Sequence, residues 1–138
     1  MTQKDKQLLI KDLCARIPYH TFVQLNPGAY NKPETCLLTG IHGEKIHLNV
    51  DSDPFRIDHI KPYLRPMSSM TEEEEKIFND FLEFQAEYVS DADLYNKTDM
   101  YDWLNEKKFD YRIDPFTGKT LIESDLAIEA PKDMYKNE

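Results

Sequence analysis

The chain has 138 residues, the length of one domain, and 40% of them are hydrophobic, so a core can form without disulfides or metal ions. Its 17 basic and 26 acidic residues give a net charge of -9. No apolar run approaches the ~20 residues of a membrane-spanning helix, and the polar start MTQKDK is unlike a signal peptide. We therefore expect a cytoplasmic protein and set aside a membrane protein.

The charge is divided unevenly along the chain. Residues 1–66 hold 9 basic and 7 acidic residues, whereas residues 67–138 hold 8 and 19. An acidic half repels a phosphate backbone, so any nucleic-acid binding would fall to the first half. We expect a single domain over residues 1–138, with a helix and a β-rich part up to residue 66 and an acidic helical part after it.

The first half shows one helical pattern followed by short extended runs. Residues 5–17 have apolar residues at helical spacing, with Asp12 and Arg16 on the same face, and Pro18 ends the helix. We predict strands over residues 19–25, 35–41, 45–50 and 55–57. Short strands separated by turn residues are typical of a small antiparallel sheet or an SH3-like half-barrel.

The two halves meet in the run KPYLRP, residues 61–66. Pro62 and Pro66 each fix their own backbone and keep the preceding residue out of helical geometry. The sequence therefore predicts an extended connector between the halves.

The longest helix follows this connector. Its start is marked by the spacing of a capping box, either Ser69 with Glu72 or Thr71 with Glu74, in which hydroxyl and carboxylate satisfy each other's free amides. Consecutive glutamates from Glu72 onward suit the positive end of the helix dipole. An apolar stripe over residues 77–89 predicts a helix packed on a core.

The rest of the second half alternates polar and apolar segments. Residues 90–97 read as a polar break, after which Thr98 or Asp99 would cap a helix over residues 100–108. We further predict an extended run over 109–112, a turn over 114–118, a short helix or strand over 121–127 and a loose tail from 131. The fold class is thus α+β, with an N-terminal helix, the small sheet, the connector, two helices and an irregular C-terminal end.

Three segments carry a resemblance to a known group of proteins. KPYLRPMSSMTEEE (61–74), DWLNEKKFDYR (102–112) and LAIEAP (126–131) resemble a family of short uncharacterised proteins encoded in Bacteroidetes genomes, their phages and mobile elements. The resemblance implies a phage- or mobile-element-associated cytoplasmic protein, and it implies no functional residues. The chain departs from the family pattern at residues 113–120.

The sequence shows no catalytic signature, and we predict no cofactor, metal or catalytic residue. Gly118-Lys119-Thr120 resembles the end of a phosphate-binding loop, but the glycine that the motif needs five positions earlier is an isoleucine. His42 and His47 could face each other across a turn, yet they lack the spacing of a metal motif. Cys14 and Cys36 are expected to be reduced and structural.

Aromatic and guanidinium side chains are the residue types that dominate protein interfaces. The candidates for partner binding are Tyr63, Arg65, Trp103, Tyr111 and Arg112. The alternative is that the aromatic residues among them pack the second half onto the sheet. We expect Tyr63 to be buried and Arg65 to stay at the surface.

The leading functional hypothesis is a non-enzymatic module that binds a cytoplasmic protein. An alternative is a nucleic-acid-associated protein, in which the acidic half would serve solubility or mimic DNA. Its basic surface would be formed by Lys11, Arg16, Lys32, Lys45 and Arg56. A third is an enzyme of unrecognised type.

Overall fold

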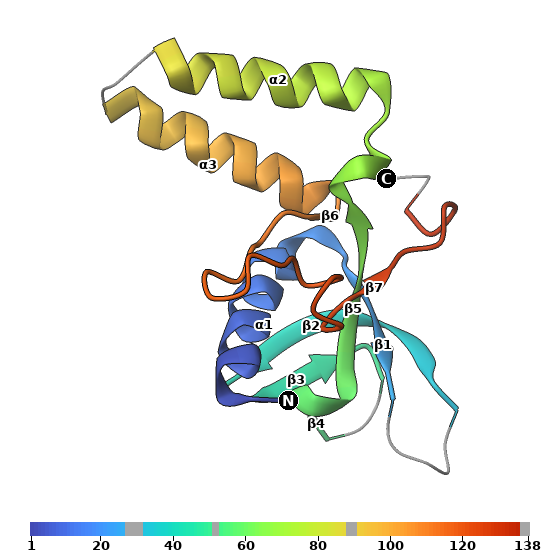
Figure 1. Ribbon diagram of the computed structural model, residues 1–138. Coiled ribbons are helices and arrows are strands. Elements are labelled where there is room, and N and C mark those ends of the chain that lie inside the picture. The colour runs from blue at the N-terminus through green and yellow to red at the C-terminus, as the bar shows by residue number, and fades with distance from the viewer. Residues whose placement is uncertain (27–31, 51–52, 88–90, 136–138) are drawn as a thin grey trace.

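The computed structural model describes residues 1–26, 32–50, 53–87 and 91–135 and has the α+β fold that the sequence predicts (Figure 1). The helices are α1 (Gln3–Arg16), α2 (Glu72–Glu87) and α3 (Asp91–Glu106), with short 3₁₀ helices at Ile17–Tyr19, Ile57–His59 and Met67–Ser69. The strands are β1 (Phe22–Leu25), β2 (Glu34–His42), β3 (Lys45–Leu48), β4 (Phe55–Arg56), β5 (Ile60–Pro66), β6 (Phe109–Asp110) and β7 (Ile128–Glu129).

The strands form one mixed, open sheet. Its order is β4-β3-β2-β1-β5-β6, and β7 also pairs with β5. The strands β1 to β4 pair antiparallel, as predicted. The predicted connector, β5, is also a strand of the sheet and pairs antiparallel with β1, whereas β6 and β7 run parallel to β5. A parallel pair needs a long crossover between its strands, and α2 with α3 supplies it between β5 and β6. The helical half therefore returns to the sheet, which sequence periodicity did not reveal.

β5 is the segment that reads as a connector in the sequence. It is extended, as predicted, and lies in the sheet between β1 and the strands from the second half. Successive residues of a strand direct their amides to opposite edges, so Pro62, Leu64 and Pro66 share one edge. On this edge the Leu64 carbonyl accepts the Ala130 amide at 2.7 Å, while the prolines have no amide to donate. β7 consequently pairs with β5 over only two residues.

Two hydrophobic clusters stabilise the fold. The larger lies between α1 and the sheet, and Leu9, Leu13, Val23, Ile46 and Leu64 are fully buried in it. The smaller joins the α2–α3 hairpin to β6 through Met100, Leu104 and Phe109. In Figure 1 the hairpin extends from one end of the molecule, with α3 between α2 and the rest of the chain. No helix in the described part of the chain is both long and apolar enough to cross a membrane.

The helix boundaries differ from the prediction at α3. This helix begins at Asp91, so most of the predicted polar break is helical, and Thr98 and Asp99 do not cap it. Acidic residues at a helix start are favoured by the dipole, which explains why polar residues there do not interrupt the helix. In α2, Phe78 packs inward while Ile77 and Leu82 are exposed. The predicted stripe from Phe84 onward lies outside the described side chains.

The C-terminal segment is anchored up to Tyr135, contrary to the predicted loose tail. The Tyr135 hydroxyl accepts the Phe22 amide and donates to the Tyr63 carbonyl, both at 2.9 Å. Its ring lies 5.6 Å from that of Phe22. These contacts hold the segment that ends at Tyr135 against β1 and β5.

Arg65 fastens the start of α2 to β5. Its guanidinium donates to both carboxylate oxygens of Glu74, at 2.8 and 2.7 Å, and also to the Ser69 carbonyl. Glu74 forms the predicted capping box with Thr71 at the same time. The hydrogen bond from Arg65 is the largest cause that lowers the pKa of Glu74, and the hydrogen bonds from Thr71 lower it further.

Glu74→Gln should destabilise the protein at neutral pH, because it removes a two-point charge-assisted contact; the cost is on the order of 1–3 kcal/mol. Since the folded-state pKa of Glu74 is lowered, its contribution is complete above the ordinary glutamate pKa. The contribution is lost as pH falls through the folded value. Urea unfolding at neutral pH and at about pH 3 measures both effects.

The exposed neighbour Glu73→Gln is the control and should change the unfolding free energy little at either pH. A difference between wild type and Glu74→Gln that did not shrink on acidification would contradict this assignment.

Candidate interaction surface

The structure does not gather the five predicted partner-binding residues into one site. Tyr63 is buried in β5, as expected. Arg65 is partly buried and packs over the Phe109 ring, 4.3 Å from its centroid, so it has a structural role that its sequence did not indicate. Trp103 reaches the same ring from α3, with centroids 5.7 Å apart.

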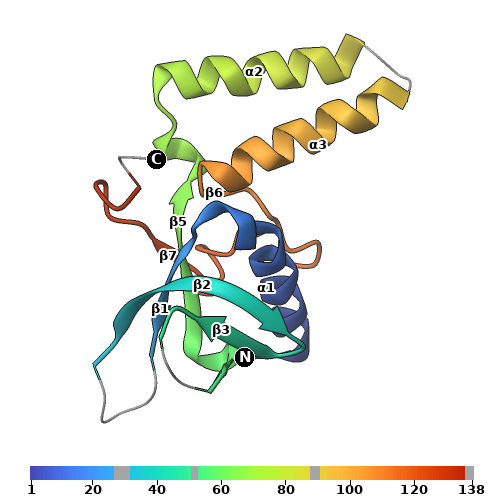
Figure 2. The same cartoon turned by 180° about the vertical axis from the view of Figure 1, so that it is seen from behind.

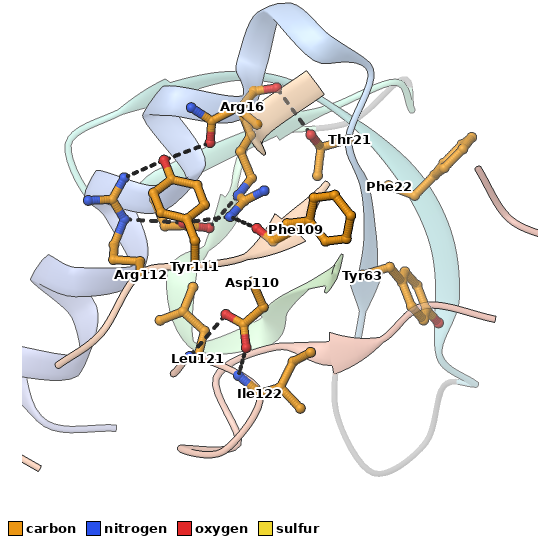
Figure 3. A network of polar contacts seen from close by, with 12 residues as sticks. Arg16, Thr21, Phe22, Tyr63, Phe109, Asp110, Tyr111, Arg112, Leu121 and Ile122 are labelled. Atoms are coloured by element: carbon orange, nitrogen blue, oxygen red, sulfur yellow. Dashed lines mark hydrogen bonds and ion pairs between the residues drawn. The ribbon is translucent and has the colours of Figure 1, made fainter. Parts of the chain in front are cut away.

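Tyr111 and Arg112 lie instead against α1, around a buried ion pair (Figure 3). Asp12 and Arg16 are fully buried, and the guanidinium donates to both Asp12 oxygens, at 2.8 and 3.1 Å. It also donates to the Phe109 carbonyl at 2.7 Å. Arg112 donates to Asp12 at 3.2 Å from the other side. One carboxylate thus connects α1 with β6 and the residues after it.

Buried polar groups in this network are largely satisfied by hydrogen bonds. The Tyr111 hydroxyl donates to the Asn105 side-chain oxygen at 2.9 Å, and Thr21 donates to the Arg16 carbonyl at 3.1 Å. Nη1 of Arg16 is the exception, since no described residue accepts a hydrogen bond from it. Because Arg16 is buried, it cannot belong to a basic surface, and this part of the nucleic-acid prediction is wrong.

Asp110 is a second buried carboxylate, and its hydrogen bonds hold the chain that follows β6. Its carboxylate accepts the Leu121 and Ile122 amides at 3.2 and 3.1 Å. Burial nevertheless raises its pKa, because these bonds do not fully replace the lost hydration. Between the ordinary and the raised value the folded state binds more protons, so the stability contributed by Asp110 falls as pH rises through that window.

Three exposed apolar side chains and the half-buried Tyr111 lie beside this network. We call Tyr101, Tyr111, Ile113 and Phe116 the aromatic strip. The exposed fractions of Tyr101, Ile113 and Phe116 are 45%, 57% and 76%. The rings of Tyr101 and Tyr111 lie 5.4 Å apart, and Nζ of Lys4 lies 3.9 Å from the centroid of Phe116. The strip therefore links α3 with the start of α1.

A short, well-bonded loop presents Phe116. Ile113 and Thr120 form an isolated antiparallel bridge, and the Asp114 side chain accepts the Phe116 amide at 2.8 Å. The Gly118 amide donates to the Asp114 carbonyl at 2.8 Å, with the glycine at φ +70°. A positive φ favours glycine, so Gly118 serves a surface turn rather than a phosphate-binding loop. The turn predicted here is confirmed, whereas its exposed phenylalanine was not foreseen.

A polar cleft of about 600 Å³ lies apart from the strip. It opens between the start of α2, the end of α3 and the segment after β7, with Arg65 and Glu74 in its wall. The carboxylates of Glu73, Glu106 and Glu129 and the amines of Lys107 and Lys132 also line it. Ligand sites are typically apolar with a few polar groups, whereas seven of the 13 residues that line this cleft are charged.

The remaining sequence candidates are dispersed. His42 lies opposite Lys45 and His47 opposite Gly40, so the two histidines do not face each other across the strands. Within the described ranges no three potential ligands come together as a metal site. Both cysteines are free; Cys36 is buried, but Cys14 is exposed on α1 and does not pack in the core.

No family model, curated protein or solved structure matches the chain. The resemblance to the Bacteroidetes and phage family thus stays a prediction.

Asp12→Asn should be strongly destabilising, because it leaves the buried Arg16 without its counter-ion; loss of one partner of a buried pair costs about 3–5 kcal/mol. Denaturant unfolding measures this cost. The control is Asp125→Asn, which breaks an exposed pair with Lys61 and should cost under about 1 kcal/mol. Equal losses in the two variants would show that the buried pair does not hold α1 to β6.

Proposed function

We propose that the chain is a non-enzymatic cytoplasmic module that binds a protein partner through the aromatic strip. The observation that carries the proposal is the exposure of Phe116, 76%, together with that of Ile113, 57%, on a loop held by its own hydrogen bonds. Exposed apolar surface of this kind marks interaction sites when it is contiguous. Association with phages or mobile elements belongs to the same proposal and rests on the sequence resemblance alone.

The composition of the strip and its support favour protein binding. Tyrosine and arginine are enriched among the residues that contribute most to interfaces, and the Arg112 guanidinium lies 5.5 Å from the ring centroid of Tyr111 in the strip. The buried Asp12 holds Arg112 from behind. A surface that is ordered before binding loses little conformational entropy when the partner docks.

The buried acidic groups have structural partners, which also favours a binding role. Asp12 is paired with Arg16 and Arg112, and Asp110 accepts two backbone amides. Catalysis needs a group free to exchange a proton or attack a substrate. Neither carboxylate is available for that without breaking the fold.

The double variant Ile113→Ser with Phe116→Ser should lose its partner while it remains folded. Truncations at exposed positions usually change the unfolding free energy by about 0.5 kcal/mol or less, so the melting temperature should stay close to that of wild type. Tagged wild-type and variant chains recovered from the native host are compared by mass spectrometry. Proteins that wild type recovers should be depleted with the variant.

Ile77→Ser is the matched control, since Ile77 is also exposed, on α2. It should recover the same partner as wild type. Retention of the partner by the double variant, or its loss in both variants, would contradict the assignment to the strip.

A further inference from the structure

The outer face of β2, β3 and β4 carries a row of basic side chains. The strand register places His42 opposite Lys45 and Lys45 opposite Arg56. Residues paired across antiparallel strands project to the same face, so the three side chains are neighbours. All three are exposed, whereas Ile46, on the other face, is fully buried. In Figure 2, β2 and β3 lie toward the viewer, with β5 behind them.

The positive charge on this face is poorly compensated. The Arg56 side chain is 73% exposed and contacts Asp58 through Nη2 alone, at 3.2 Å. Asp58 is also shared with Lys6, at 3.8 Å. Lys45 has no ion-pair partner among the described residues, and the adjacent Glu44 accepts a hydrogen bond from Gln3 at 3.4 Å. Like charges directly opposite each other destabilise a sheet, so Lys45 and Arg56 weaken the β3–β4 pair that holds them.

We propose that this face binds an acidic, extended peptide segment of a protein partner. Neighbouring strands lie about 4.8 Å apart, so the row spans roughly 10 Å. Alternate side chains of an extended peptide are about 7 Å apart, which lets two carboxylates reach Lys45 and Arg56. β4 is the terminal strand of the sheet, and a peptide strand added beside it would place a carboxylate opposite Arg56.

The dimensions and the charge of the chain favour a peptide over a nucleic acid. Proteins that bind a duplex through its phosphates typically neutralise several of them along the backbone. This row holds two full positive charges, Lys45 and Arg56, in a chain of net charge -9. Long-range repulsion by the rest of the molecule therefore opposes a long polyanion more than a short acidic segment.

Fluorescence anisotropy with a labelled peptide of alternating glutamate and valine tests the proposal. The acidic peptide should bind and the same peptide with glutamine in place of glutamate should not, with affinity falling between about 50 and 200 mM salt. Lys45→Glu and Arg56→Glu should each weaken binding by about tenfold or more. Lys45→Glu should also raise the melting temperature, because it places opposite charges across β3 and β4.

Lys11→Glu, an exposed charge reversal on α1, is the control and should bind like wild type. The double variant of the aromatic strip should bind the acidic peptide unchanged, which separates this proposal from the proposed function. Undiminished binding by Lys45→Glu, absence of peptide binding at low salt, tighter binding of a single-stranded oligonucleotide of matched length, or self-association of the chain through this face would each overturn it.

Discussion

The two prolines of β5 constrain how the halves of the chain meet. Neither proline has a backbone N–H group, and both positions face the same edge of the strand. β7 therefore pairs with that edge over only two residues between the prolines. β6 pairs with the end of the same strand, where Arg65 donates its amide to the Lys108 carbonyl. The helical half is therefore held at one strand by short ladders, and side chains must complete the attachment. Arg65 does so by binding Glu74 at the start of α2.

The second attachment depends on buried charge. Burying Asp12 and Arg16 costs hydration, which is offset only because each group finds several partners. Those partners come from β6 and from Arg112, nearly a hundred residues along the chain. The pair thereby selects one placement of α1 against the second half, since any other leaves a charge unpaired in the core. The same contacts hold the residues behind the aromatic strip.

The two proposed surfaces follow from what the fold leaves unsatisfied. The aromatic strip exposes apolar area that the core does not use, and the row on β2, β3 and β4 exposes positive charge that the described residues neutralise only in part. They lie on different elements and call for different partner chemistry, one apolar and one acidic. A module with both surfaces could bind two parts of one partner. Its affinity would then rise because the first contact keeps the second part of the partner at a high effective concentration.

Local patterns in the sequence determined most of the element types, because helical spacing, proline and turn residues act within a few positions. The α1 face, the Thr71–Glu74 capping box and the turn near Gly118 all follow from neighbours in the chain. Helical spacing also placed Asp12 and Arg16 on one face of α1, but it did not indicate that they form a buried ion pair. Only the tertiary structure decided that β6 and β7 join β5 in parallel, that Arg65 is partly buried, and that Lys45 faces Arg56. Each of these features depends on segments that are distant in the sequence. A strand register or a buried contact between two such segments produces no periodic pattern in the sequence of either segment.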